Sequence, residues 1–292
     1  MANRPDAEID ITLALARQLV GGQFPELNNM RLAVLSRGWD NTNFRLGDNH
    51  IVRIPHREAA APLIVHEQRW LPEIAQLVSL SIPTPTHHGE PTDDYPWRWS
   101  ITPWFPGEEA ATATLDEPQR TVEILAEFYN QLHVSAPADA VTNPYRGGPL
   151  RECSARFESR VTSNDAACDI QAIAAVFDRA LVAEPSSQQV WLHGDLHGRN
   201  MIVHHGRLSA VIDWGDLCTG DRATDLAGAY MLVPDHLDEL RSRVNATDAD
   251  WERARGWAAH FAVMYLTHSD DDPVMGSIGA RLCDTLLATH GA

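Results

Sequence analysis

The sequence predicts an α+β protein of two lobes, because short strand patterns fill its first third and helical patterns dominate the rest. Three short apolar segments joined by tight turns occur before residue 106, whereas long helical patterns follow Gly107, notably over 118–134 and 168–183. A chain of 292 residues is long enough for one or two domains. We therefore predict an N-terminal lobe over 1–106 and a larger, mostly helical lobe over 107–292.

The elements of the first lobe follow from hydrophobic periodicity and turn residues. Apolar residues at helical spacing predict a helix over Ile9–Val20. The segments MRLAVLSR, NTNFRLGD and HIVRIP predict three strands of an antiparallel meander. AAAPLIVHEQRWLPEIAQL predicts a second helix, and WRWSITP a further strand after a proline-rich loop.

In the second lobe, two short apolar runs interrupt the helical pattern. They are VWLHGDL and NMIVHHGRLSAVIDW, within residues 190–214. The sequence His204-His205-Gly206 inside the second run predicts the tip of a hairpin rather than a metal site. After it the pattern is helical again, and Trp257, Phe261 and Tyr265 are spaced as a core stripe of one helix.

The charge of the chain restricts its partners. The formal net charge of −17 argues against a nucleic-acid partner, because phosphate binding needs concentrated positive charge. Residues 107–292 hold 28 of the 40 acidic side chains but only 14 of the 23 basic ones. Such an acidic half favours either a cationic substrate or solubility alone.

Location and redox state follow from what the sequence lacks. No run of eighteen apolar residues occurs, so we expect no membrane span, and the start MANRPDAEID does not resemble a secretory signal. The four cysteines are far apart in the sequence and form no CxxC pair, which predicts reduced, mostly buried thiols. We expect a cytoplasmic protein.

The strongest chemical signal is HGDLHGRN, residues 193–200, followed by IDWG at 212–215. The first segment fits the kinase catalytic-loop pattern H-x-D-L-x-x-x-N, and the second occupies the place of D-F-G. Phosphoryl transfer needs Mg²⁺ held by hard oxygen ligands, which Asn200 and Asp213 would supply. Asp195 would orient an acceptor hydroxyl and accept its proton.

With HGDLHGRNMIV and VIDWGDLCTGDRATDLA, the chain resembles the aminoglycoside phosphotransferase family, which shares its two-lobed fold with protein kinases. The resemblance extends from Ser36 to about Asp225. It implies Asp195 as the catalytic base, with Asn200 and Asp213 as magnesium ligands. It also implies that His193 supports the catalytic loop and that Asp225 is the structural acid that braces it.

The resemblance implies a reaction as well. A member of this family would transfer the γ-phosphate of ATP or GTP, with Mg²⁺, to a hydroxyl of a small molecule. An aminoglycoside-like compound is the first expectation, another antibiotic or a metabolite the wider one, and a macrolide, choline or a sugar are the alternatives. Antibiotic resistance is compatible with this reading but is not implied by it.

The first lobe holds the candidate nucleotide residues. In SRGWDNTNF, Gly38 and the short polar residues that include Asn41 resemble the family's nucleotide loop, although one glycine alone is equally typical of a simple hairpin. The chain contains no lysine, and Arg53 in HIVRIP occupies the place of the usual phosphate-binding lysine, with Glu67 as its expected partner. Arginine can clamp phosphate bidentately, but its bulk and geometry differ from those of lysine.

The segment ITPWFPG resembles the hinge at which backbone groups pair with the nucleotide base. Pro103 has no N–H to donate, so Phe105 is the expected donor and the Pro103 carbonyl a possible acceptor.

Other functional classes lack their signatures. GDLHG also resembles the first metal motif of calcineurin-like metallophosphoesterases, but the GDxVDRG and GNHE segments of that family are absent. A P-loop requires lysine, and there is no GxGxxG or GxSxG. The remaining alternative is a pseudokinase or nucleotide-binding module, favoured only by the missing lysine and the sparse glycine loop.

Overall fold

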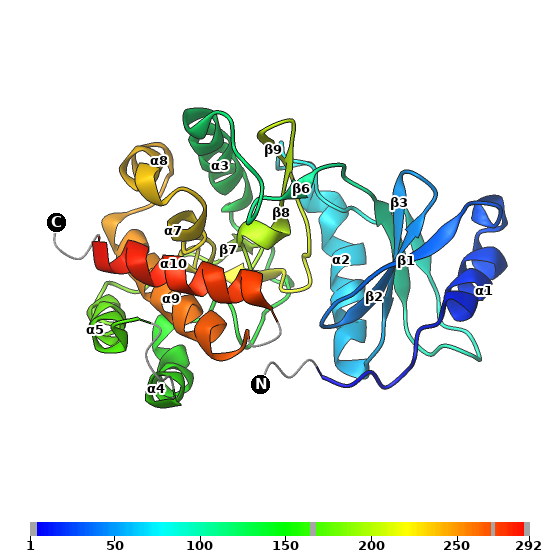
Figure 1. The fold of residues 1–292 in the computed structure, drawn as a ribbon, viewed down its shortest axis with the longest axis horizontal. Helices are drawn as coiled ribbons and strands as arrows, with labels where there is room; N and C mark the ends of the chain where they lie inside the picture. The colour runs from blue at the N-terminus through cyan, green and yellow to red at the C-terminus, as the bar shows by residue number, and fades with distance from the viewer. Residues whose placement is uncertain (1–4, 164–167, 270–271, 289–292) are drawn as a thin grey trace. The chain divides into compact units, whose positions relative to one another are not determined.

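The computed structural model describes residues 5–163, 168–269 and 272–288. These residues form two compact units (Figure 1). The smaller unit contains residues 5–77 and 81–106, and the larger unit contains residues 78–80 and those from Gly107 onward. An antiparallel sheet dominates the smaller unit and helices dominate the larger one, so the predicted α+β class is confirmed.

The smaller unit is built on one antiparallel sheet of strand order β1-β2-β3-β5-β4. The predicted meander forms its first three strands, and the last predicted strand pairs with β3. The proline-rich loop contributes only a short edge strand. The bounds are β1 Leu32–Arg37, β2 Asn41–Leu46, β3 His50–Pro55, β4 His87–Gly89 and β5 Trp99–Pro103.

Two helices cover the two faces of this sheet (Figure 1), namely α1 (Leu13–Gln23) and α2 (Ala61–Ile74). Strand residues alternate between the faces. One set, with Phe44, Val52 and Trp99, joins α1 in the hydrophobic core of the unit. The opposite set, with Arg53, faces α2, and this alternation is what brings a strand arginine to a helix. Short 3₁₀ turns at Pro25–Leu27 (η1) and Glu58–Ala60 (η2) complete the unit.

The first helix begins later than predicted, at Leu13 instead of Ile9. The reason is a capping residue: the Thr12 hydroxyl accepts a hydrogen bond from the Leu15 N–H at 3.1 Å, which satisfies one of the free amides at the helix start. The helix also continues past Val20 to Gln23, through two glycines that lower helix propensity but do not end the helix.

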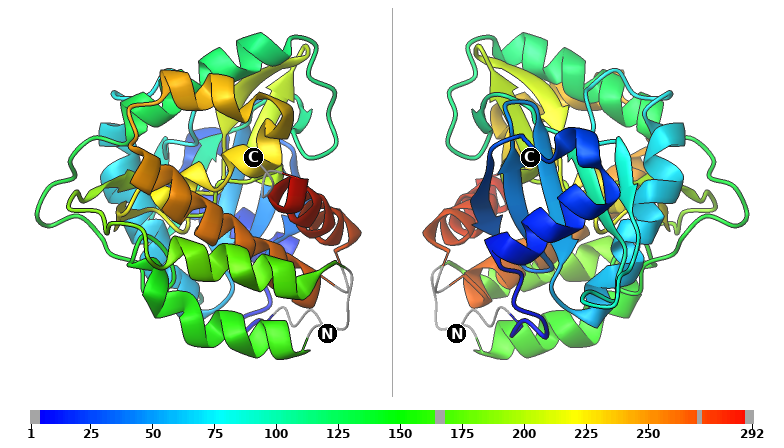
Figure 2. Two further views of the ribbon diagram at one scale, coloured as in Figure 1. Left: turned by 90° about the vertical axis from the view of Figure 1, so that its left-hand side faces the viewer. Right: turned by 90° about the vertical axis from the view of Figure 1, so that its right-hand side faces the viewer.

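The larger unit packs its helices around α9, which contacts α4, α5, α6 and α10 (Figure 2). The predicted stripe of Trp257, Phe261 and Tyr265 is buried on α9, with successive ring centroids 5.6 and 6.0 Å apart. The helices are α3 Pro118–Leu132, α4 Ser154–Ser163, α5 Ile170–Ala180, α6 Ala223–Leu226, α7 Ala229–Leu232, α8 Leu237–Arg243, α9 Asp248–Thr267 and α10 Pro273–Ala288. Short 3₁₀ turns are η3 Leu150–Cys153, η4 Gly198–Asn200 and η5 Pro234–His236.

Two small sheets of the larger unit flank the segments HGDLHGRN and IDWG. β7 (Val190–Leu192) pairs with β10 (Cys218–Gly220). β8 (Met201–His204) pairs with β6 (Glu108–Glu109) and with β9 (Arg207–Val211). The β8–β9 hairpin turns at His205 and Gly206, as predicted, and both have positive φ, which a tight turn requires. HGDLHGRN therefore lies between β7 and β8, and IDWG follows β9.

All four cysteines are free, and three of them are buried. One pair lies close in space, because the Cys283 and Cys168 thiols are 2.9 Å apart although 115 residues separate them in the sequence. Among the described residues, no helix combines the length and the apolar composition needed to cross a membrane.

A close backbone approach joins β10 to the loop before α4. A Cβ atom added to Gly220 would lie 2.3 Å from the Gly147 oxygen and 2.5 Å from its Cα, well inside van der Waals contact. Gly147 itself has φ +72°, a conformation that favours glycine. The two glycines therefore fix where the residues preceding Gly147 lie.

We expect Gly220→Ala to lower the free energy of unfolding by about 1–3 kcal/mol, because backbone on the other side of the contact has to move. Gly276→Ala in α10 is the control, since its added Cβ would have ordinary contact only, 3.8 Å from Ser269 Cβ. Urea denaturation of both variants measures the difference. Equal stability of the two variants would show that the contact is not tight.

Candidate active site

The turn after β7 is held by one buried carboxylate. Asp225, on α6, accepts hydrogen bonds from the backbone N–H groups of His193 and Gly194, each at 2.8 Å. Gly194 has φ +87°, and an added Cβ would lie 2.4 Å from the backbone carbonyl oxygen of Asp216. His133 lies 3.4 Å from the same carboxylate. The predicted bracing residue thus contacts the two residues that precede Asp195.

His193 connects this turn to the segment after β9. Its Nε2 lies 2.9 Å from the Ile212 carbonyl oxygen, and its Nδ1 accepts a hydrogen bond from the Asp195 N–H at 3.2 Å. The ring is buried and meets Trp214 edge-on, with centroids 4.8 Å apart. A single imidazole therefore ties the backbone of Asp195 to the residue immediately before Asp213.

Asn200 is brought to the same place by the β8–β9 hairpin. Its side-chain nitrogen donates to the Asp195 backbone carbonyl oxygen at 2.9 Å, and its backbone carbonyl accepts from the Ile212 N–H at 2.8 Å. Asp213 follows with φ +61°, one of the few non-glycine residues described with a positive φ. Such a conformation is strained and is found mainly at functional sites.

The oxygens of this group fit Mg²⁺. Because the amide nitrogen of Asn200 is engaged, its Oδ1 is the atom left to bind a cation, and Asp213 adds a carboxylate. Mg²⁺ is commonly held by one or two protein oxygens together with substrate phosphates and water. Among the described residues, no three His, Cys, Asp or Glu side chains converge to hold a metal by themselves.

Asp195 carries its charge beside two cationic or polar groups. Its carboxylate lies 3.3 Å from His197 Nε2 and 3.4 Å from Arg146 Nη2. Burial would raise the pKa of Asp195, but these two neighbours outweigh it and hold the pKa well below its usual range. The carboxylate is therefore ionised at physiological pH and can accept a hydrogen bond from a hydroxyl.

The smaller unit contains the predicted pair of Arg53 and Glu67. Arg53 Nη1, on β3, donates to Glu67 Oε2, on α2, at 2.7 Å, and both side chains are buried. Asn43 is the β2 neighbour of Arg53 in the sheet register. An arginine thus forms, in this chain, the strand-to-helix ion pair that the sequence analysis expected. Its role toward a nucleotide stays a prediction.

The remaining predicted nucleotide residues lie in turns of the same unit. The Gly38 N–H closes the β1–β2 turn by donating to the Asn41 carbonyl oxygen at 2.8 Å, so it is already engaged. The Asn41 side-chain oxygen is buried and has no described partner. After β5, the Trp104 N–H donates to the backbone carbonyl oxygen of Asn49 at 2.8 Å, whereas Phe105 has no hydrogen bond among the described residues. This pattern leaves Phe105 as the donor that follows Pro103.

A family model described as "Phosphotransferase enzyme family" matches residues 31–257. The chain belongs to this family of phosphotransferases. The match includes every predicted site residue, from Gly38 to Asp225.

Solved structures share the kinase-like fold. The GDP complex of wild-type aminoglycoside 2'-phosphotransferase-IIIa is similar with a TM-score of 0.70 and 18% identity, over 96% of this chain and 99% of that one. Macrolide 2'-phosphotransferase MphH from Brachybacterium faecium, without ligand, has a TM-score of 0.60 and 17% identity, over 92% and 98%. A streptomycin–ATP complex of APH(2")-IIa has a TM-score of 0.59 and 16% identity, over 92% and 95%. At these identities the likeness shows the fold alone.

Sequence reasoning missed part of this phosphotransferase site. Arg146 lies 3.7 Å from Asp216 as well as 3.4 Å from Asp195, and Asn143 donates to Asp216 at 2.7 Å. The carboxylates outweigh burial and raise the pKa of Arg146. The only local signal for Arg146 is the Gly147–Gly148 turn that follows it, which does not predict a contact with a residue 49 positions away. His197 was visible within HGDLHGRN but was given no role.

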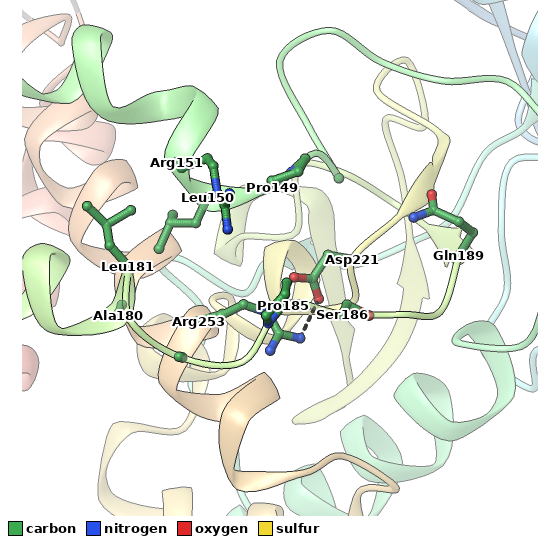
Figure 3. A pocket seen from close by; sticks show the side chains of 12 residues that line it. Pro149, Leu150, Arg151, Ala180, Leu181, Pro185, Ser186, Gln189, Asp221 and Arg253 are labelled. Atoms are coloured by element: carbon green, nitrogen blue, oxygen red, sulfur yellow. Dashed lines mark hydrogen bonds and ion pairs between the residues drawn. The ribbon is translucent and has the colours of Figure 1, made fainter.

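A small pocket of the larger unit lies beside this loop without including the site (Figure 3). It is lined by Gly147 and Pro149 on one side and by the segment from Ala180 to Gln189 on another. Two of its charged residues pair with each other, since Arg253 Nε donates to Asp221 at 2.6 Å. Asp221 in turn donates its N–H to the Gly147 carbonyl at 2.8 Å, so this pair stabilises the loop that carries Arg146.

We expect Asp225→Ala to lower the free energy of unfolding by about 2–5 kcal/mol, because two buried backbone N–H groups lose their acceptor. Asp235→Ala, at an exposed position, is the matched control and should cost less than about 0.5 kcal/mol. Urea denaturation measures both. A similar small loss in the two variants would contradict the bracing role of Asp225.

Proposed function

We propose that this phosphotransferase is a Mg²⁺-dependent small-molecule kinase, which transfers the γ-phosphate of ATP or GTP to a hydroxyl group. The observation that carries the proposal is the position of Asp195. Its ionised carboxylate lies on a loop whose backbone also contacts Asn200, and His193 links that loop to the residue before Asp213. A base and two metal-binding oxygens on one braced framework are the parts that phosphoryl transfer requires.

In the proposed step, Asp195 accepts a hydrogen bond from the acceptor hydroxyl and directs its oxygen at the γ-phosphorus. A new oxygen–phosphorus bond forms, the bond between the γ-phosphorus and the bridging oxygen breaks, and the nucleoside diphosphate leaves. The hydroxyl proton passes to the Asp195 carboxylate and then to solvent. Because its pKa is lowered, Asp195 acts mainly by orienting the hydroxyl and takes the proton late.

The donor's phosphates need positive charge. Mg²⁺ held by Asn200 and Asp213 would neutralise charge that develops on the phosphate oxygens. We assign Arg53 to the α- and β-phosphates, because Glu67 fixes its guanidinium at 2.7 Å and arginine forms paired hydrogen bonds with phosphate. The presence of Asp195 together with Asn200 and Asp213 argues for the enzyme over the pseudokinase alternative, since nucleotide binding alone would not require a base.

The hinge does not distinguish adenine from guanine as the base of the nucleotide donor. In the proposal, the Phe105 N–H and the Pro103 carbonyl pair with the base, and both ATP and GTP offer an acceptor and a donor at that edge. The solved relatives were captured with GDP in one case and with ATP in another. We therefore propose that either nucleotide serves.

The acceptor is a small hydroxylated molecule, for which the family suggests aminoglycosides, macrolides, choline or sugars. The acidic residues that favoured a cationic acceptor are largely occupied within the larger unit. Asp250 pairs with Arg253 at 2.6 Å, Asp248 with Arg241 at 3.1 Å and Glu239 with Arg243 at 3.1 Å. Asp272 pairs with Arg199. Asp270 and Asp271 lie outside the described residues.

Asp195→Asn should lower kcat by at least about 100-fold, because the variant loses the carboxylate that orients and deprotonates the hydroxyl. Its affinity for Mg²⁺-nucleotide should stay within about twofold, since the phosphate-binding residues are intact. Transfer of labelled γ-phosphate to a panel of hydroxyl compounds measures the first quantity, and calorimetry the second. Full turnover in this variant would sink the assigned role.

Asp213→Ala should weaken Mg²⁺-nucleotide binding by at least about tenfold as well as abolish turnover, because a direct metal ligand is lost. Asp238→Ala, at an exposed position on α8, serves as the charge-matched control. Nucleotide titrations at several Mg²⁺ concentrations measure the effect. An unchanged Mg²⁺ dependence would mean that another residue holds the metal.

A further inference from the structure

Three arginines gather beside the candidate active site although the larger unit is strongly acidic. Arg146 lies on the loop before Gly147, and Arg156 and Arg160 lie one turn apart on α4. We refer to these three residues as the arginine cluster. Arg156 lies over the ring of Tyr145, the residue before Arg146. Burial, together with the charges of Arg160, Arg146 and Arg156, lowers the pKa of the buried His260 to about 3.

The cluster contains polar atoms that the protein does not satisfy. Within the described part of the chain, Arg160 Nη1, Arg146 Nε and His260 Nδ1 are buried and have no hydrogen-bond partner. Buried polar atoms without partners are rare and costly in native proteins. Three such nitrogens, two on guanidinium groups and one on the imidazole itself, indicate hydrogen-bonding capacity for a ligand.

The charge of the cluster is only partly compensated. Arg146 pairs with Asp195 and Asp216, but in the described residues neither Arg156 nor Arg160 has a carboxylate within salt-bridge distance. Their polar contacts go to neutral or basic groups: Arg156 Nη2 donates to Cys153 Sγ at 3.4 Å, and Arg160 Nε to His268 Nε2 at 3.3 Å. Burial and the other two arginines lower the pKa of Arg160. A bound anion would compensate the charges of Arg156 and Arg160.

We propose that the arginine cluster binds an anionic group of the acceptor, so that the acceptor is a hydroxylated carboxylate or phosphate ester rather than a polycation. This inference rests on the proposed function, whose acceptor class it specifies. Guanidinium groups bind carboxylates and phosphates through paired, charge-assisted hydrogen bonds. Arg156 and Arg160 hold the anion, and the hydroxyl of the same molecule reaches Asp195.

Arg146 joins the anion site to the base. It is the member of the cluster that also touches Asp195, at 3.4 Å, and its guanidinium lies over the Phe261 ring at 5.4 Å. The loop that carries it is fixed on both sides of Gly147, whose N–H donates to the Thr224 hydroxyl at 3.2 Å. An acceptor held by Arg156 and Arg160 therefore lies near an ionised carboxylate whose position is defined.

The surface around the cluster is open to a ligand. Arg156 and Arg160 are partly exposed, and Tyr145, over whose ring Arg156 lies at 5.5 Å, is 59% exposed. An aromatic face beside guanidinium groups suits the carbon skeleton of a small acid.

Binding is tested first, without turnover. Ribose 5-phosphate and gluconate are titrated into the full-length protein by calorimetry, with ribose and glucose as uncharged counterparts, and inorganic phosphate reports whether the anion alone suffices. We expect only the charged probes to bind, with affinity that falls as salt rises. Arg156→Gln and Arg160→Gln should each weaken binding by about tenfold, the loss of one charge-assisted hydrogen bond. Arg151→Gln, at an exposed position just before α4, is the matched control.

Phosphate transfer then distinguishes this inference from the proposed function. We expect kcat/KM to be highest for acceptors with a carboxylate or phosphate, and to fall about tenfold in Arg156→Gln and Arg160→Gln while nucleotide affinity is unchanged. Equal binding of the charged probes in these variants, or preferred transfer to aminoglycosides that the substitutions do not alter, overturns the anion site. Absence of any Asp195-dependent transfer, with anion binding still lost in the variants, overturns the kinase assignment and leaves the anion site standing. Melting temperatures of the variants exclude misfolding as the cause.

Discussion

The arrangement of the candidate active site depends on the buried carboxylate of Asp225. Its two oxygens accept the N–H groups of His193 and Gly194, and these bonds set the direction in which the chain enters Asp195. A buried carboxylate is costly unless its hydrogen bonds are made, so the turn and the acid stabilise one another. The ring of His193 in turn contacts the Ile212 carbonyl oxygen, so it also positions the residue that precedes Asp213. The proposed base and the proposed metal-binding residues are thus positioned by a buried carboxylate to which no catalytic role is assigned.

Much of this was predictable because the residues involved are close in the sequence. The spacing in HGDLHGRN and IDWG, with a hairpin between, brings Asn200 and Asp213 to one end of β8–β9, as strand pairing requires. The pairing of Arg53 with Glu67 was predictable because the kinase pattern pairs a cation of the third strand with a glutamate of the following helix. By contrast, Arg146 meets Asp195 only through the packing of Gly147 against Gly220. No periodicity or motif encodes such a contact, and only the folded chain shows it.

The summed charge of a segment was a poor guide to the binding partner for the same reason. The excess of acids in residues 107–292 favoured a cationic partner, but a sum does not say which charges meet. In the structure, Asp221 and Asp250 both pair with Arg253, and these pairs stabilise the scaffold behind the loop of Gly147. Arg156 and Arg160 are among the arginines of the larger unit that have no carboxylate within salt-bridge distance in the described residues, so a negative sum does not exclude a local site for an anion.

The groups beside Asp195 affect the role proposed for its carboxylate. Arg146 and His197 keep its carboxylate ionised and lower its basicity, which suits a group that orients a hydroxyl more than one that removes a proton early. Phosphoryl transfer tolerates a weak base, because little bonding to the attacking hydroxyl has formed in its loose transition state. The proton of that hydroxyl therefore need not leave early, and position matters most. The guanidinium that weakens the base is also the one that connects it to Arg156 and Arg160. In the proposed function, Arg146 would therefore set both the protonation of Asp195 and the position of the acceptor, which would account for a positive charge so close to the proposed base.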